Sequence, residues 1–249
     1  MALISSLDKL GQYVLLMRKV ITTPQKWGVF FRQLMKEINK LGVDSISIVI
    51  IISFFIGAVI VIQIALNITS PLLPRYTVGY TSREIILLEF SSTIMCLILA
   101  GKVGSNISSE IGTMRVTEQI DALEIMGVNS ANYLILPKMV GLMVFVPVLV
   151  VLSMFFGVIG GFGVCYFTHA VPVSDFEYGL QSFFNEFYIW YAIMKTVFFA
   201  FLIASVAAYY GYFAKGGSLD VGKASTNAVV VTSVLILISD LIITDLMMG

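Results

Sequence analysis

Residues 46–66 read ISIVIIISFFIGAVIVIQIAL, a run of 21 residues without a charged side chain. A helix rises about 1.5 Å per residue, so this run spans about 31 Å, which is enough to cross the hydrocarbon core of a bilayer. The run predicts a membrane-spanning helix. It divides the chain into an N-terminal region, residues 1–44, and a membrane domain, residues 45–249.

Four further apolar segments follow, which makes five in all. Counted from the N-terminus, the second contains Glu89, the fourth contains Lys195 and the fifth contains Asp240, and no other charge interrupts the four segments. The sequence therefore predicts an all-α integral membrane protein with five transmembrane helices. Their expected bounds are residues 46–66, 85–101, 139–167, 187–214 and 224–244.

Composition agrees with this fold class and excludes others. Of the 249 residues, 58% are hydrophobic and 12% are charged, whereas a soluble domain carries about 25% charged residues. Lysine plus arginine equals aspartate plus glutamate, which argues against nucleic acid as a partner. Cys96 and Cys165 both lie in apolar stretches and have no spacing typical of a metal site, so no metal is expected.

The distribution of basic residues predicts the orientation in the membrane. They concentrate before the first span and in the loops after the second and fourth spans, whereas the alternate loops hold only Arg75 and Arg83. By the positive-inside rule the N-terminus is cytoplasmic. With five spans the C-terminus then lies outside.

Residues 22–41 predict an amphipathic helix just before the first span. Trp27, Phe30 and Phe31 recur at helical spacing, and basic residues are distributed around them. Aromatic and basic residues together are typical of a helix at the membrane interface. The alternative is a short cytoplasmic helix packed on the protein.

A second short helix is predicted in the cytoplasmic stretch between spans two and three. Thr117 is a plausible N-cap, Glu118 and Asp121 lie in the first turn, and Gly127 is a plausible stop. Such a helix could pass force from a soluble ATPase into the membrane helices, although spacing alone fits a solvated connector equally well. The residues assigned to this coupling helix are Thr117, Glu118, Gln119, Asp121, Ala122, Glu124, Met126 and Gly127.

Residues 100–128, AGKVGSNISSEIGTMRVTEQIDALEIMGV, resemble the signature of the MlaE permease family. Residues 30–63 are similar to the interfacial helix and first span of that family, and residues 194–244 are similar to its last two spans. One departure occurs in the second span. Family members commonly show Glu-Leu-Gly-Pro there, whereas this chain has Glu89-Phe90-Ser91-Ser92.

The resemblance implies a permease subunit of an ABC transporter in the bacterial inner membrane, without enzymatic activity of its own. It implies a homodimer, a cytoplasmic ABC ATPase that receives the 117–127 helix and binds ATP and Mg²⁺, and a periplasmic lipid-binding MCE subunit. A small cytoplasmic accessory protein is also compatible. The implied substrate is phospholipid, moved between the membrane and the periplasmic carrier to support outer-membrane lipid asymmetry. No cofactor is expected in this chain.

The charges within the spans are candidate functional residues because an ionisable group in a membrane is costly. We expect Glu89 and Lys195 to line the outer end of a lipid pathway, where Lys195 meets a phospholipid headgroup. The alternative is a structural ion pair between spans two and four. Asp240 lies near the outer end of the fifth span, where water can reach it.

Two other patterns have simpler interpretations. Residues 217–224 nearly match a phosphate-binding P-loop, but Ala224 stands where Ser or Thr is required and a membrane span precedes the stretch. We expect a tight turn there and no ATP binding. Gly157 and Gly161 have the spacing of small residues at helix contacts, which suits packing within one subunit better than a dimer seam.

Two other functions compete with the permease assignment. The first is an ion-coupled secondary transporter that uses Glu89, Lys195 and Asp240 and needs no ATPase. Such transporters often contain inverted repeats, and no convincing internal repeat is found across the five spans. The second is a membrane scaffold without transport. A co-purifying ATPase would distinguish the permease from both.

Overall fold

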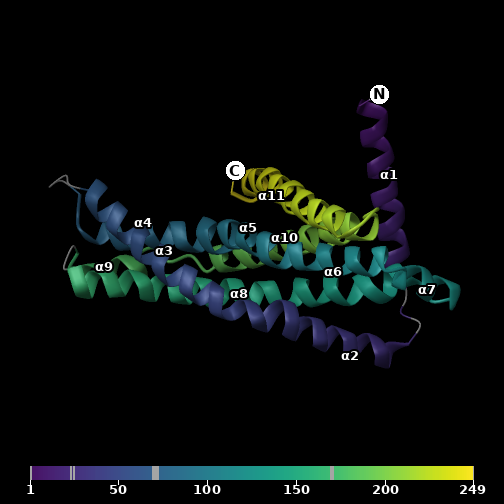
Figure 1. Cartoon of the computed structure of the whole chain (residues 1–249). Helices are drawn as coiled ribbons and strands as arrows, with labels where there is room; N and C mark the ends of the chain where they lie inside the picture. The colour runs from purple at the N-terminus through teal and green to yellow at the C-terminus, as the bar shows by residue number, and fades with distance from the viewer. Residues whose placement is uncertain (1, 23, 25, 69–72, 169–170, 249) are drawn as a thin grey trace. The chain divides into compact units, whose positions relative to one another are not determined.

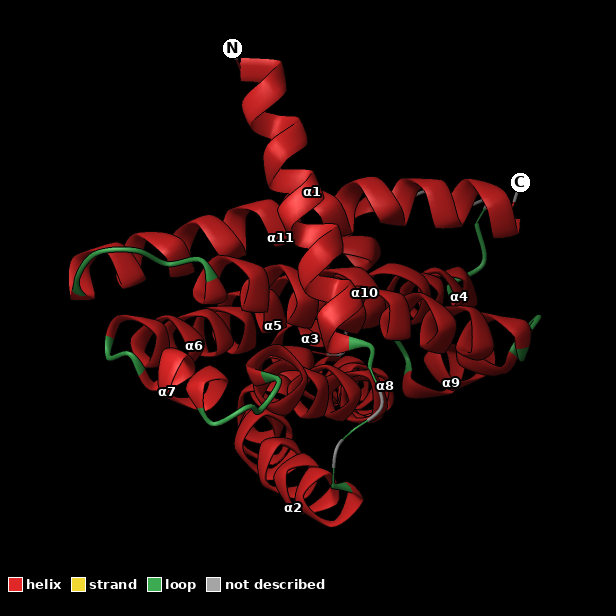
Figure 2. Ribbon diagram, turned by 90° about the vertical axis from the view of Figure 1, so that its right-hand side faces the viewer, coloured by secondary structure: helices red, strands yellow, loops and turns green. Residues whose placement is uncertain are grey.

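The structure is a computed structural model that describes residues 2–22, 24, 26–68, 73–168 and 171–248, with side chains from Asp8 onward. Helices joined by short loops make up all of the regular structure of these residues, and no strand occurs among them (Figure 2). The all-α prediction is therefore confirmed.

Within the described ranges, five helices are long and apolar enough to cross a membrane, as predicted. The predicted spans lie inside these helices except for the fourth, which was expected to reach residue 214. It ends at Tyr212, because the loop that follows turns at Gly216, whose φ is +100°. The five helices are Trp27–Asn67, Tyr76–Val116, Ser130–Thr168, Phe187–Tyr212 and Ser218–Met248.

The first long helix is continuous with the predicted amphipathic segment. It begins with α2 (Trp27–Glu37), passes through η1 (Ile38–Gly42) and η2 (Val43–Ser45), and continues as α3 (Ile46–Asn67). The expected start at residue 22 was too early, since Pro24 lies in the connection before α2. On α2 itself, Trp27 and Phe31 are exposed.

The second long helix is interrupted by two π-helical segments. In order it consists of α4 (Tyr76–Ile85), η3 (Ile86–Ile94), α5 (Met95–Leu99), η4 (Ala100–Gly104) and α6 (Ser105–Val116). A π-helical turn is wider than an α-helical turn and is frequent at functional sites. The backbone around Glu89 therefore departs from a regular α-helix, even though the Gly-Pro pair of the family pattern is absent.

The remaining elements are α1 (Ala2–Val20), α7 (Gln119–Ile125), α8 (Ser130–Thr168), α9 (Val173–Gln181), α10 (Phe187–Tyr212) and α11 (Ser218–Met248) (Figure 1). The chain forms two compact units. The first consists of Met1–Val43, Leu97–Phe145 and Phe198–Ser239, and the second of Asp44–Cys96, Val146–Val197 and Asp240–Gly249.

In the first unit, α1 packs on the protein through one side. Leu16, Met17 and Val20 are buried, and the hydroxyl of Tyr13 donates a hydrogen bond to Ser205 on α10 at 2.9 Å. Sequence patterning missed this helix, because its apolar residues are too few for a span.

In the second unit, α9 packs closely on α4. A Cβ on Gly79 would overlap the carbonyl oxygen of Phe176, so the two helices touch through their backbones. Arg83 of α4 is buried, and it donates hydrogen bonds to the carbonyl oxygens of Leu180 and Ser182 at 2.7 and 2.8 Å. Arg83 therefore holds the connection between α9 and α10, although the sequence placed it in an outer loop.

Candidate functional site

The short helix α7 starts one residue later than predicted. Glu118 has the left-handed φ of 60°, so the helix begins at Gln119. Thr117 is not the N-cap of α7; its hydroxyl donates back to the carbonyl of Thr113 at 2.8 Å and so belongs to the end of α6. Gly127 ends the segment with φ +75°, which is the left-handed conformation that glycine favours after a helix.

One side of α7 faces the protein. Ile120 is fully buried, and Asp121 accepts a hydrogen bond from Arg115 of α6 at 2.5 Å. The sequence placed Asp121 in the first turn of this helix without a partner within the chain. The structure instead uses Asp121 to attach α7 to the helix before it.

Glu124 attaches the same helix to two others. Its Oε1 atom lies 2.8 Å from the Tyr212 hydroxyl at the end of α10 and 2.9 Å from the Ser130 hydroxyl at the start of α8. The two hydroxyls are 2.9 Å from each other. Three helices therefore meet at one carboxylate.

The other side of α7 is open. Ile125 is 87% exposed and Met126 is 68% exposed. Glu118, Gln119 and Ala122 are exposed as well. Apolar side chains this open on a helix end are candidates for contact with a partner. We call these five residues the outer face of α7.

The charges inside the membrane helices form one cluster. Lys195 of α10 is completely buried, and its amino group contacts Glu89 Oε1 at 3.3 Å and also Asp240 Oδ1 of α11. The hydroxyl of Thr93 lies 3.0 Å from Asp240 and 3.3 Å from Glu89, so it can donate to either acid. The Tyr191 ring lies 5.0 Å from the same amino group.

This geometry corrects the expectation for Asp240 and changes the one for Lys195. Asp240 was expected to be wetted, but its side chain is only 16% exposed because Lys195 and Thr93 engage it. Glu89 is the open member of the cluster, with 47% of its side chain exposed. The ammonium of Lys195 is surrounded by two acids, which favours the structural ion pair that was the alternative interpretation.

Comparisons with known proteins identify the family of this chain. The model of the permease MlaE matches residues 34–246. This chain belongs to the MlaE permease family. A probable ABC transporter permease of Rickettsia bellii is 31% identical over 243 residues, which cover 96% of this chain and 92% of the relative. Another from Synechocystis is 31% identical over 216 residues, which cover 87% and 82%.

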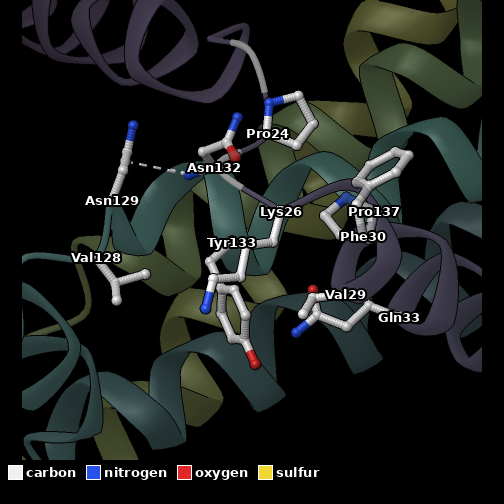
Figure 3. Close-up of a pocket in the computed structure, with 10 residues that line it drawn as sticks. All are labelled: Pro24, Lys26, Val29, Phe30, Gln33, Val128, Asn129, Asn132, Tyr133 and Pro137. Carbon is white, nitrogen blue, oxygen red and sulfur yellow. Dashed lines mark hydrogen bonds between the residues drawn. The ribbon is translucent and has the colours of Figure 1, made fainter.

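A pocket of about 320 Å³ lies between α2 and the start of α8 in this MlaE-type permease (Figure 3). In the wall of this pocket Asn129 caps α8, and its Oδ1 atom accepts a hydrogen bond from the backbone N–H of Asn132 at 3.3 Å. The amide of Asn132 donates to the carbonyl oxygens of Val20 and Thr22 at 2.8 and 2.6 Å. The two asparagines thus anchor the end of α1 to α8.

Two lysines and two glutamates form a cluster without net charge that links helices of the first unit. Lys138 of α8 is buried and contacts Glu37 and Glu110, each at 2.7 Å. Lys40 contacts the other oxygen of Glu110 at 2.9 Å. Nothing in the sequence indicated that Lys138 and Lys40 pair with Glu110, because Glu110 is 28 residues from Lys138 and 70 residues from Lys40 (110 minus 40).

The attachment of α7 is expected to depend on pH. Hydrogen bonds from Tyr212 and Ser130 hold the pKa of Glu124 below its usual range. A carboxyl group with a lowered pKa stabilises the native state above its unfolded pKa, and that contribution is lost as the pH falls through the lowered value. Hydrogen exchange of the α7 amides, corrected for the intrinsic rate, should stay constant from about pH 7 to about pH 5 and accelerate as the pH is lowered from about 5 to about 3.

The variant Glu124→Gln provides the control, because it cannot lose a proton in this range. Its α7 should exchange faster than wild type at neutral pH and change less on acidification. An identical pH response in the two proteins would show that Glu124 does not control the attachment.

Proposed function

We propose that this permease is the membrane subunit of an ABC transporter that moves phospholipid between the bacterial inner membrane and a periplasmic MCE carrier. Its family and its relatives make it a multi-pass ABC transporter permease, and a permease of this kind requires a separate ATPase. The observation that carries the proposal is the outer face of α7, which displays Ile125 and Met126.

The outer face of α7 is the proposed docking site for that ATPase. The opposite side of α7 is attached to α6, α8 and α10 through Asp121 and Glu124. A helix that is exposed on one side and attached on the other is suited to receive force and pass it on. This role requires α7 to lie in the cytoplasm, as the basic residues predict.

ATP and Mg²⁺ are proposed to bind in the partner. The near match to a P-loop, residues 217–224, opens α11, and a long helix rather than a strand precedes it. Asp220 accepts from the backbone N–H of Gly217 at 3.4 Å and pairs with Lys223 at 3.2 Å. Residues 218–224 are therefore the first turns of α11 and not the tight turn expected from the sequence, and Lys223 pairs with Asp220, which does not suit a phosphate.

Glu89 is proposed to face the phospholipid pathway, with Lys195 behind it. Glu89 is half exposed, whereas Lys195 is buried against the two acids. An exposed acid within a span is a functional candidate. Lys195 then serves by holding Glu89 in place and not by binding a headgroup phosphate.

The assembly around the permease is also proposed. Apolar residues exposed along α11, among them Leu241 and Leu246, support contact with lipid or with a second copy in a homodimer. The N-terminus would lie in the cytoplasm, and the C-terminus would lie in the periplasm beside the MCE subunit.

Reconstitution tests the proposal. The permease, co-expressed with an ABC ATPase and an MCE protein from the same bacterium, should co-purify with both. In proteoliposomes that contain fluorescent phospholipid, ATP should drive lipid transfer to or from the MCE protein. Transfer driven by a proton gradient without nucleotide, or the absence of any associated ATPase, would contradict the proposal.

The variant Ile125→Glu should reduce the amount of ATPase that co-purifies by about tenfold or more. A charge placed in an apolar contact loses its hydration without gaining a partner. Leu219→Glu is the matched control, because Leu219 is 82% exposed and does not lie on α7. Equal retention of the ATPase by both variants would remove Ile125 from the docking site.

A further inference from the structure

We propose that Tyr212 is a positioning residue that ties α7 to α10, so that a displacement imposed on α7 is passed to the fourth membrane span. The inference rests on the proposed docking of an ATPase on α7. It assigns the transmission step to one hydroxyl group and to the carboxylate of Glu124.

The hydrogen bonds at this junction leave little freedom in which group donates. An ionised carboxylate only accepts, so the Tyr212 hydroxyl donates to Glu124 across 2.8 Å. The single proton of Ser130 goes either to Glu124 or to the oxygen of Tyr212, each 2.9 Å away. Hydrogen bonds to an ionised group are roughly twice as strong as those between neutral groups. Tyr212 therefore makes the direct connection between α7 and α10.

The Tyr212 ring is held in position from other sides. The residue is 8% exposed, and the guanidinium of Arg115 lies 5.9 Å from its ring centroid. The same Arg115 donates to Asp121 of α7. Asp121 is thus linked to the Tyr212 ring through Arg115, and Glu124 is bonded directly to the Tyr212 hydroxyl.

Without these connections α7 has little to hold it. It contains 7 residues, and a helix this short is not stable by itself in water. Backbone with positive φ lies at both ends, at Glu118 with 60° and at Gly127 with 75°. Apart from buried Ile120, the side-chain links through Asp121 and Glu124 determine what moves with α7.

On the other side of the link, α10 is a continuous helix. It runs for 26 residues from Phe187 to Tyr212, about 39 Å at 1.5 Å per residue. Lys195 lies on the same helix, 17 residues before Tyr212 (212 minus 195). A pull on the hydroxyl of Tyr212 therefore acts on the helix that carries the buried lysine.

The test is Tyr212→Phe in the complete complex with its ATPase, which removes the hydroxyl and keeps the ring. The ATPase should still co-purify and hydrolyse ATP, while the phospholipid transferred per ATP falls by about tenfold, equivalent to 1.4 kcal/mol. Tyr210→Phe is the matched control, since no hydrogen bond of its hydroxyl to another described residue is found. It should leave the transfer per ATP unchanged.

A double variant tests whether Tyr212 acts through Glu124. Glu124→Gln alone should also lower the transfer per ATP, and Tyr212→Phe with Glu124→Gln should lower it no further than the larger single effect. Additive losses, or an unchanged transfer per ATP in Tyr212→Phe, would overturn the inference. If wild-type permease retains no ATPase at all, the proposed function fails instead, and this outcome is seen before any variant is compared.

Discussion

Replacing Lys195 with methionine is expected to destabilise the permease by about 3–5 kcal/mol, because it leaves two acids without their buried partner. Methionine has nearly the length of lysine, so the space is filled and the lost charge is the main change. Lys195 is the centre of the cluster, since Glu89 and Asp240 both contact its amino group, whereas the Thr93 hydroxyl contacts the two acids.

Thermal unfolding of the purified protein in detergent measures the effect. Lys223→Met is the matched control, because the side chain of Lys223 is 76% exposed and its pair with Asp220 is solvated; such pairs contribute about 0–1 kcal/mol. Adding Asp240→Asn to Lys195→Met should recover part of the stability, since it removes one of the stranded charges.

The same variant separates the two interpretations of Lys195. If Lys195 held a phospholipid headgroup, Lys195→Met would impair lipid crosslinking while the fold stayed as stable as the control. If it is a structural ion-pair partner, stability falls, and Asp240→Asn recovers part of both the stability and the transport. An unchanged melting temperature would contradict the structural role.

Gly160→Ala is expected to cost about 3 kcal/mol or more through overpacking. A Cβ at this position would overlap the carbonyl oxygen of Phe54 and lie 3.1 Å from the backbone nitrogen of Ala58. Both neighbours are backbone atoms of α3, so no side-chain rotation relieves the overlap. The helices α3 and α8 would have to separate along this contact.

Gly163→Ala on the same helix is the matched control, because its Cβ would meet only the Phe54 ring at 3.6 Å, an ordinary contact. Yield of monodisperse protein in size-exclusion chromatography, followed by the melting temperature, distinguishes the two. Gly160→Ala should give little folded protein and Gly163→Ala a normal yield. Equal yields would mean that α3 and α8 are less closely packed than the structure shows.

The spans could be predicted because hydrophobic length is a local property of the chain. The run at residues 46–66 is long enough for a bilayer wherever it packs. The sequence also favoured packing within one subunit over a dimer contact for Gly157. Its Cα lies against Gly57 of α3 within the same chain. These features depend on residue type and spacing alone.

The charge partners could not be predicted in the same way. Asp240 meets Lys195 only because α10 and α11 are rotated so that the two residues face each other, and no periodicity in either helix specifies that rotation. The sequence suggested Glu89 as the partner of Lys195 and left Asp240 at a wetted end. The hydroxyls that serve Glu124 come from Ser130 and Tyr212, which are 6 and 88 residues away.

The start of α7 shows a limit of capping rules. Thr117 is a favoured N-cap type and is followed by acids, yet the left-handed residue Glu118 separates it from the helix. Thr117 lies between two neighbouring helices, and its hydroxyl bonds to α6 and not to α7. Residue preference alone does not decide between them.

The π-helical turns at residues 86–94 determine which side of the second span Glu89 presents. A π-helical turn holds more residues than an α-helical turn, so every residue after it is rotated about the helix axis relative to an uninterrupted α-helix. Ser91 and Ser92 occupy the places of the Gly-Pro pair in the family pattern, yet the backbone departs from a regular α-helix there. The rotation of this span therefore does not depend on a proline.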